Sequence, residues 1–326
     1  MDKLFHKILR KRSEISVRYD PITESIWVYG NPKLRPCLSL NMIKEINELQ
    51  YEIKGYFELY DMMPKIPIKY FVFASQIPGI YNYGGDLNLF SELIKNKDKI
   101  KLFDYAKLCI DVVYMNAINL HLPITTIALV EGDALGGGFE AAVSCNVLIS
   151  EEQSQMGLPE IRFNLIPGMG AYSFLARLVG IKVAEEIITS GKMYDASTLH
   201  EMGVITEVVK KGEGEAAVNK FMKRNSRLFN GMQAIQAARQ RYQPIDYDEL
   251  IDITKIWVDA ALRLTPKDLK MMQKLVDAQN LKNINAQHKL RTKQDRRFER
   301  ENINFPFIDS EGTIIEEERR VNPDPR

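Results

Sequence analysis

Cysteine and histidine are scarce in this chain of 326 residues, which contains three cysteines and four histidines. The cysteines, Cys37, Cys109 and Cys145, lie far apart, form no CxxC pair and are odd in number. A disulfide framework is therefore not expected, and a reducing compartment such as the cytosol fits the composition better. The four histidines lack the spacing of metal ligands, so the sequence predicts no zinc site.

Long apolar runs and an excess of charge are also absent. No window reaches the roughly 18 apolar residues of a membrane-spanning helix, and the basic stretch 1–15 lacks the unbroken apolar segment of a signal peptide. The 44 Lys and Arg residues against 43 Asp and Glu residues give a net charge of +1. This balance provides no global field for nucleic acid or acidic lipid, so we expect no nucleic-acid partner and no membrane insertion.

What the sequence does contain is an alternation of strand and helix patterns, which predicts an α/β protein with a largely buried parallel sheet. Ile15, Val17 and Tyr19 alternate with polar residues, as in a half-buried strand. After about residue 204 the pattern is mostly helical, and residues 286–326 are rich in charge. The other expected elements are strands at 25–29, 70–74, 124–130 and 147–149, helices at 87–95, 102–120 and 139–145, and a helix that begins at 41.

Three consecutive glycines, Gly136, Gly137 and Gly138, end a glycine-rich turn at 132–138, where an expected strand gives way to a helix. Without side chains, this backbone can approach a ligand closely, and the first N–H groups of the helix are free to bind an anion or a developing oxyanion. The offsets match neither GxGxxG nor GxxxxGK(S/T), so a dinucleotide or a nucleotide triphosphate is not supported. Tight packing of the helix against the strand explains the run equally well.

Two glutamates in apolar surroundings are candidates for acid–base chemistry. Glu140 lies three residues after Gly137, so both face the same side of a helix, and a carboxylate among apolar neighbours needs partners or a catalytic role. Glu160 is flanked by apolar residues too, and two such groups suggest a paired acid and base. The alternative is that Glu140 is an ordinary surface residue in the first turn of a helix. The segment 83–86 (YGGD) is a second candidate for presenting backbone N–H groups, or a plain turn.

Three segments together resemble the signature of the crotonase (enoyl-CoA hydratase/isomerase) superfamily. Their order and spacing agree with the family pattern, including the twenty residues from Glu140 to Glu160, and the match covers roughly residues 14–280. The resemblance implies a crotonase-like spiral of ββα units with a C-terminal helical region. The segments are YGGDL at 83–87, IALVEGDALGGGFE at 127–140, and GLPE at 157–160 followed by IPGMG at 166–170.

Three regions follow from this resemblance. Residues 1–205 are expected to form the spiral core, and residues 206–285 the C-terminal helical region. Residues 286–326 do not match the superfamily pattern and are expected to form a charged tail.

The same resemblance assigns site residues. The backbone N–H groups of Gly85 and Gly137 would form an oxyanion hole, and Glu140 and Glu160 would be the acid–base pair. By family analogy Glu160 removes the α-proton and Glu140 protonates the leaving hydroxyl, but a helix N-terminus favours an ionised Glu140, so the roles within the pair remain open. The expected acyl-chain pocket consists of Met169, Trp257 and Leu275, although packing alone would explain Trp257.

A narrower resemblance is to the diffusible-signal-factor synthases, and it rests on GDALGGGFEAA at 132–142, MGLPE at 156–160, PGMGAYSF at 167–174 and residues 251–278. It implies dehydration of a 3-hydroxyacyl carrier-protein or CoA thioester to a cis-2-enoyl thioester, then hydrolysis to the free unsaturated acid. It also suggests a sensor kinase as a further partner. The superfamily resemblance implies a homotrimer or hexamer, and we expect no cofactor or metal. An ordinary enoyl-CoA hydratase or isomerase, or a regulator that binds acyl thioesters or a sensor protein without turnover, are the alternatives.

Overall fold

The computed structural model describes residues 3–32, 35–63, 65–281, 307–308 and 314–315. The chain divides into two compact units, Met1–Asn283 and Ile284–Arg326. In the second unit the described residues form two short antiparallel strands, β11 (Phe307–Ile308) and β12 (Ile314–Ile315). The rest of the charged tail predicted over 286–326 lies outside the described residues. No helix in the described part of the chain is both long and apolar enough to cross a bilayer.

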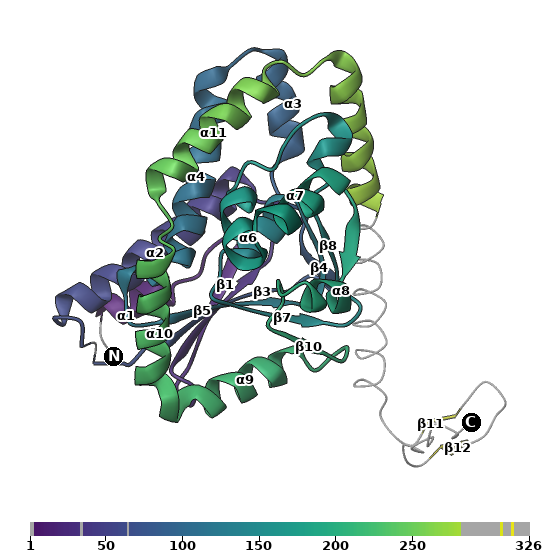
Figure 1. Ribbon diagram of the computed structural model, residues 1–326. Helices are drawn as coiled ribbons and strands as arrows, with labels where there is room; N and C mark the ends of the chain where they lie inside the picture. Colours follow the sequence, from purple (N-terminus) through teal and green to yellow (C-terminus); the bar gives the residue numbers. More distant parts are fainter. Residues whose placement is uncertain (1–2, 33–34, 64, 282–306, 309–313, 316–326) are drawn as a thin grey trace. The chain divides into compact units, whose positions relative to one another are not determined.

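Two sheets organise the first unit (Figure 1). The larger sheet is parallel except for the β1–β2 hairpin, and the smaller sheet is parallel except for the β8–β9 pair. In spatial order the larger sheet consists of β1 (Ile15–Asp20), β2 (Ser25–Gly30), β3 (Tyr70–Ser75), β5 (Thr125–Val130), β7 (Val147–Glu151) and β10 (Glu207–Val209). The smaller sheet consists of β4 (Gly79–Asn82), β6 (Gly132–Leu135), β8 (Gln155–Gly157) and β9 (Met193–Asp195).

The chain forms these sheets in repeated strand–strand–helix units. β3, β5 and β7 each enter the larger sheet, and the strand that follows each of them enters the smaller sheet in the same order. Helices then return the chain, and this confirms the α/β class and the ββα spiral predicted from the sequence. The helices of the spiral are α1 (Lys3–Ile8), α2 (Leu40–Leu59), α3 (Leu87–Lys95), α4 (Lys99–Ala117), α5 (Gly137–Val143), α6 (Ala171–Val179), α7 (Ile181–Ser190) and α8 (Ala196–Glu201), with short 3₁₀ turns η1 (Asn119–His121) and η2 (Pro159–Phe163).

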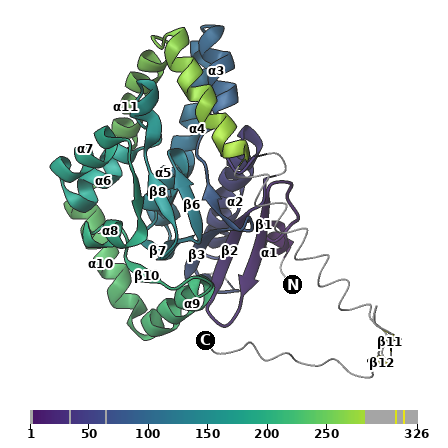
Figure 2. The ribbon, with the colours of Figure 1, turned by 90° about the vertical axis from the view of Figure 1, so that its right-hand side faces the viewer.

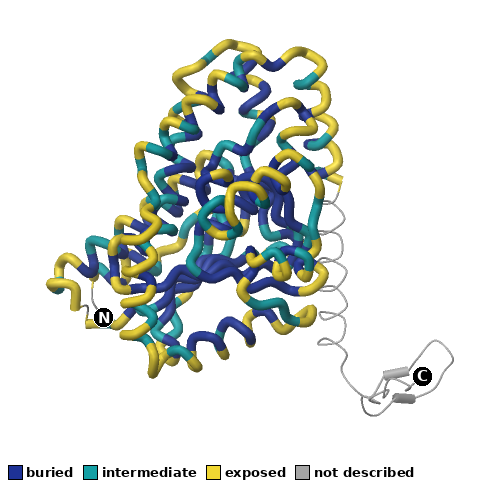
Figure 3. Tube along the Cα trace, in the orientation of Figure 1, coloured by how far each residue is buried: buried dark blue, intermediate teal, exposed yellow. Residues whose placement is uncertain are grey.

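The larger sheet is buried on both faces, as parallel sheets require. All residues of β5 and β7 are buried, and these central strands of the sheet are dark blue in Figure 3, whereas the edge strands β1 and β10 are only partly buried. One face packs against Phe221 and Met222 of α9 (Gly214–Asn225), and the opposite face packs against α2 and α4. The strands read as continuous apolar runs because both of their faces are covered.

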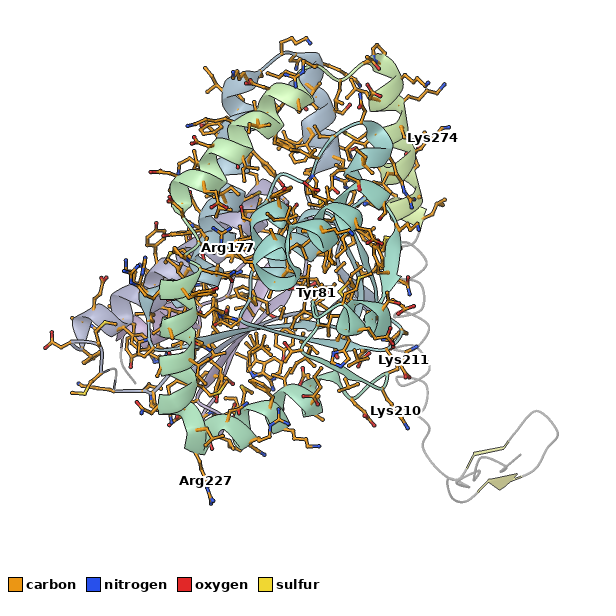
Figure 4. All side chains as sticks on the ribbon, in the orientation of Figure 1. Tyr81, Arg177, Lys210, Lys211, Arg227 and Lys274 are labelled. Atoms are coloured by element: carbon orange, nitrogen blue, oxygen red, sulfur yellow. The ribbon has the colours of Figure 1, made fainter. Side chains whose placement is uncertain are left out.

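The C-terminal helical region predicted from the sequence is present. It consists of α9, the 3₁₀ turn η3 (Ser226–Leu228), α10 (Phe229–Tyr242), α11 (Tyr247–Ala261) and the helical residues 266–281. α11 and residues 266–281 lie at the same end of the unit as α3, as Figures 1 and 2 both show. Lys99 at the start of α4 forms an ion pair with Asp259 of α11 (2.7 Å), and Arg177 of α6 (Figure 4) forms one with Glu249 (2.7 Å).

Three local features differ from the expectations. The stretch predicted as a glycine-rich turn contains strand β6, and α5 begins at Gly137 rather than at Phe139. β6 pairs so closely with β4 that a Cβ on Gly132 would lie 2.0 Å from the carbonyl carbon of Gly79, so the glycine serves strand pairing. The mostly helical region after residue 204 also includes β10, which extends the larger sheet beside β7.

Candidate active site

The backbone N–H groups of Gly85 and Gly137 lie close together. Each comes shortly after a strand of the smaller sheet, in the first and second ββα units. Gly85 follows β4, and Gly137 is the first residue of α5 after β6. A Cβ on Gly137 would lie 3.3 Å from the Gly85 nitrogen, and a Cβ on Gly84 would lie 2.7 Å from the Gly137 nitrogen. The two backbone segments therefore touch, and the approach leaves no room for a side chain at Gly84.

Neither of these N–H groups has a hydrogen-bond acceptor among the described residues. Gly137 is the first residue of a helix, where an N–H has no intrahelical partner. The Gly85 loop is fixed on both sides, because Leu38 donates to the Gly84 carbonyl (2.7 Å) and Asp86 caps α3. The pair of amides is therefore held in place and free to bind an oxygen, as the sequence predicted for an oxyanion hole.

Glu140 lies on the first turn of α5 with 1% of its surface exposed. Its Oε1 accepts hydrogen bonds from the backbone N–H groups of Met169 (2.7 Å) and Ala171 (2.9 Å). Ala171 is the first residue of α6, so the carboxylate sits at the positive end of a second helix as well as its own. Burial raises the pKa of Glu140, while the backbone donors lower it and favour the ionised form.

Glu160 reaches the same site from η2, immediately after β8. The residue keeps partial solvent contact, but its Oε2 is buried and has no hydrogen-bond partner among the described residues. Its Oε1 lies where a Cβ on Gly136 would come within 2.4 Å, and Gly136 has a φ of +50°. Glycine at 136 is therefore required twice, for the backbone conformation and for the space that this carboxyl occupies.

The surroundings of the two carboxyl groups affect their pKa values differently. Burial, and then the charge of Glu140, raise the pKa of Glu160 to about 8, and its Oε2 accepts no hydrogen bond from the described residues. Glu140 instead has two amide donors that stabilise its carboxylate. Of the two carboxyls, Glu140 therefore has the surroundings that favour the charge, and Glu160 those that favour the proton.

All seven residues predicted for the site line one cavity. Besides Gly85, Gly137, Glu140 and Glu160, these are the expected acyl-pocket residues Met169, Trp257 and Leu275. The sequence analysis missed other residues of the wall, including Phe90, Tyr105, Cys109, Phe163 and Gln279. The four apolar residues look like any core position, and Gln279 looks like any polar residue of a helix, so no signal in the sequence distinguished them.

The C-terminal helices cover this cavity within one chain. The Trp257 ring packs edge-to-face on Phe90, with ring centroids 5.2 Å apart, and would lie 2.8 Å from a Cβ on Gly168. Gln279 donates to the Tyr83 carbonyl beside the oxyanion loop (3.4 Å). No group of three His, Cys, Asp or Glu side chains in the described part of the chain is arranged for a metal ion.

With this geometry established, comparison with known proteins adds the family. The family model for enoyl-CoA hydratase/isomerase matches residues 67–256, which include both glycine loops and both glutamates. The chain belongs to the enoyl-CoA hydratase/isomerase family. This crotonase-family membership confirms the superfamily resemblance read from the three motifs.

Curated relatives of this crotonase-family chain include human mitochondrial methylglutaconyl-CoA hydratase, which is 30% identical over 186 residues (57% of this chain and 50% of the relative). A probable enoyl-CoA hydratase 2 of Arabidopsis thaliana mitochondria is 34% identical over 167 residues (51% of this chain and 52% of the relative). The chain spans about half the length of the curated relatives it matches.

Solved structures share the crotonase fold. Enoyl-CoA hydratase from Bacillus halodurans superposes with a TM-score of 0.67 at 16% identity, covering 80% of this chain and 100% of that one. Pseudomonas aeruginosa DspI superposes with a TM-score of 0.59 at 24% identity, covering 71% of this chain and 89% of that one. At these identities the likeness shows the fold alone.

The raised pKa of Glu160 predicts how stability of this crotonase-family protein depends on pH. The folded protein keeps a proton on Glu160 that the unfolded chain releases near its ordinary value of 4.5, so folded stability falls as the pH rises from about 4.5 through about 8. We expect Glu160→Gln to raise Tm by about 3 °C or more at pH 9, because the buried charge is removed. At pH 5, where the carboxyl is already neutral, we expect little change.

Thermal unfolding followed by circular dichroism at the two pH values measures this effect. Glu186→Gln on the exposed surface of α7 is the matched control and should move Tm at neither pH. A gain at pH 5 equal to that at pH 9 would show that the effect does not come from titration.

Proposed function

We propose that this protein dehydrates a 3-hydroxyacyl thioester to the cis-2-enoyl thioester and then hydrolyses it to the free unsaturated acid, as the resemblance to the diffusible-signal-factor synthases implies. The observation that carries this proposal is one largely apolar cavity lined by two glycines with unpaired N–H groups and by two carboxyls, one held by backbone donors and one with an unpartnered oxygen. An acyl carrier protein or CoA would deliver the acyl group.

Dehydration needs help because a thioester α-proton is far less acidic than a carboxylic acid. Hydrogen bonds from the Gly85 and Gly137 N–H groups to the thioester oxygen stabilise the enolate that forms. In this step the ionised Glu160 accepts the α-proton, the C–O bond to the 3-hydroxyl breaks, and Glu140 supplies the proton that turns the hydroxide into water. The step ends with a neutral Glu160 and an ionised Glu140.

Hydrolysis starts from that same state. Glu140 takes a proton from water as the water oxygen attacks the thioester carbon, and the two amides now stabilise the tetrahedral oxyanion. The C–S bond breaks, and Glu160 gives its proton to the departing sulfur. The pair returns to a neutral Glu140 and an ionised Glu160, which is the state that dehydration requires.

The surroundings of the two carboxyls favour one of the two proton arrangements in this cycle, so a proton must pass from Glu160 to Glu140 before dehydration begins. The two backbone donors to Glu140 and the unpartnered carboxyl of Glu160 favour the state that follows dehydration and precedes hydrolysis. The family-based roles, Glu160 as base and Glu140 as acid, then apply to the dehydration step. The helix N-terminus that favours an ionised Glu140 serves the hydrolysis step.

The direct test is turnover of 3-hydroxydodecanoyl carrier protein and of 3-hydroxydodecanoyl-CoA, with the products identified by mass spectrometry. We expect a free 2-dodecenoic acid, and gas chromatography of its methyl ester distinguishes the cis from the trans isomer. Formation of an enoyl thioester without free acid would contradict the hydrolysis step and favour an ordinary enoyl-CoA hydratase. The family membership and the named activities of the curated relatives also favour this alternative. No turnover, together with capture of a sensor kinase domain, would favour a regulator.

Three further points stay predictions from the sequence. A homotrimer or hexamer is implied by the superfamily resemblance, and a cytosolic location by the cysteine usage. The division of the first unit at residue 205 is the third.

A further inference from the structure

A second cavity lies beside the reaction cavity. It is lined by aliphatic side chains from β1, β2, α2 and α4, among them Ile15, Val28, Ile43 and Val113. It contains none of the residues assigned to proton transfer or to the oxyanion hole, but it shares Cys109 and Met169 with the reaction cavity.

The partition between the two cavities is thin and flexible. The Met169 sulfur would lie 2.5 Å from a Cβ on Gly137, and the Leu38 Cδ1 would lie 3.4 Å from the same point. Both side chains therefore stand directly over the oxyanion glycine. Methionine is unbranched and adapts its rotamer easily, so this partition can move when a ligand needs the space.

The opposite wall of the reaction cavity is closed by packed aromatic rings. Phe90 contacts Tyr105 and Trp257 edge-to-face, with ring centroids 5.1 and 5.2 Å apart. All three rings belong to residues that are less than 10% exposed, and Phe90 would lie 2.6 Å from a Cβ on Gly85. A long alkyl chain bound at the oxyanion hole finds these rings already in contact with one another.

The polar groups around the second cavity do not oppose an alkyl chain. The Asn82 Oδ1 accepts from the Gly84 N–H (2.7 Å), and the Asn116 Nδ2 donates to the Ser144 Oγ (3.1 Å). Tyr81 (Figure 4) lines the cavity, and burial raises the pKa of its hydroxyl, so it stays neutral. A neutral, largely apolar wall fits methylene groups and disfavours a charged ligand.

We propose that this second cavity binds the distal methylenes of the acyl chain, which enter past Met169, and that the free space beside Gly30 sets the chain length that the protein accepts. The inference rests on the proposed function, since it assumes an acyl thioester at Gly85 and Gly137. Each buried methylene strengthens binding about fourfold. Four methylenes kept out of this cavity therefore weaken binding on the order of 100-fold.

Gly30→Leu tests the proposal by filling the cavity from the end of β2. A Cβ on Gly30 would meet the Met42 Cε at 3.6 Å and the Ala74 oxygen at 3.8 Å, which are ordinary contacts. Gly55→Leu on α2 is the matched control, because a Cβ there has nothing within 4 Å. Dissociation constants of saturated acyl-CoAs with four, eight and twelve carbons are measured by calorimetry, with Tm as the check on folding.

We expect Gly30→Leu to raise the ratio of the twelve-carbon Kd to the four-carbon Kd by about 50-fold or more, and Gly55→Leu to leave it unchanged. Met169→Ala should lower this ratio by about threefold to tenfold, since it widens the passage, and it tests the proposal even if Gly30→Leu does not fold. An unchanged ratio in Met169→Ala, or in folded Gly30→Leu, overturns the inference. Binding is measured without turnover, so the two proposals can fail separately. If the protein binds acyl-CoA with the expected ratios but makes no acid, only the proposed function is contradicted.

Discussion

Glu160→Gln is expected to lower the dehydration rate at least about 1000-fold, because glutamine cannot accept the α-proton. Glu140→Gln should cost as much, since it cannot protonate the leaving hydroxyl. Alanine at either position should likewise abolish product while the protein stays folded. Single-turnover assays with a 3-hydroxyacyl-CoA measure the loss, and circular dichroism checks the fold.

The two glutamine variants should separate when the second step is measured alone. Hydrolysis of an added 2-enoyl-CoA needs Glu140 to activate water, so Glu140→Gln should stop it. Glu160 only protonates a thiolate, which leaves readily because a thiol pKa lies near about 8.5. Glu160→Gln should therefore slow hydrolysis by only about tenfold. Dehydration at the normal rate in either variant, or equal losses of hydrolysis in both, would contradict the assigned roles.

Gly137→Ala is expected to lower kcat about 100- to 1000-fold with little loss of stability. A Cβ at this position would stand 3.3 Å from the Gly85 nitrogen, in the space where a thioester oxygen accepts both hydrogen bonds. The nearer contact, 2.5 Å to the Met169 sulfur, is with the end of a flexible side chain that can move aside.

Steady-state kinetics of Gly137→Ala should be compared with Gly55→Ala, where the added methyl group meets nothing within 4 Å. The control should keep its full rate. A Gly137→Ala protein with the kcat of the parent would show that the two amides do not act together on the reacting carbonyl.

Much of the larger sheet and several helices could be predicted from the sequence. α3 spans the predicted residues 87–95, and β3 and β5 agree with their predictions to within one residue, because long apolar runs and good caps mark them locally. The smaller sheet was not predicted. Its strands are three or four residues long, too short to show a period of two, and they form because neighbouring turns of the spiral pair with them.

The site, too, could be predicted only in part from the sequence. Gly137 and Glu140 are one helical turn apart, so the sequence alone placed them on one face. The meeting of Glu160 with Glu140 depends on the pairing of β6 with β8 and on the hydrogen bond from the Gly136 N–H to the Gly157 carbonyl (2.9 Å). These contacts join distant parts of the chain, and only the family resemblance supplied them beforehand.

The order of the spiral gives this site a modular character. The first ββα unit contributes Gly85, the second contributes Gly137 and Glu140, and the third contributes Glu160. Each chemical part therefore comes from a separate segment, and a substitution in one segment can alter a single part if the close contacts at Gly84 and Gly136 are kept. Such a layout lets new reactions arise on an old scaffold by stepwise replacement.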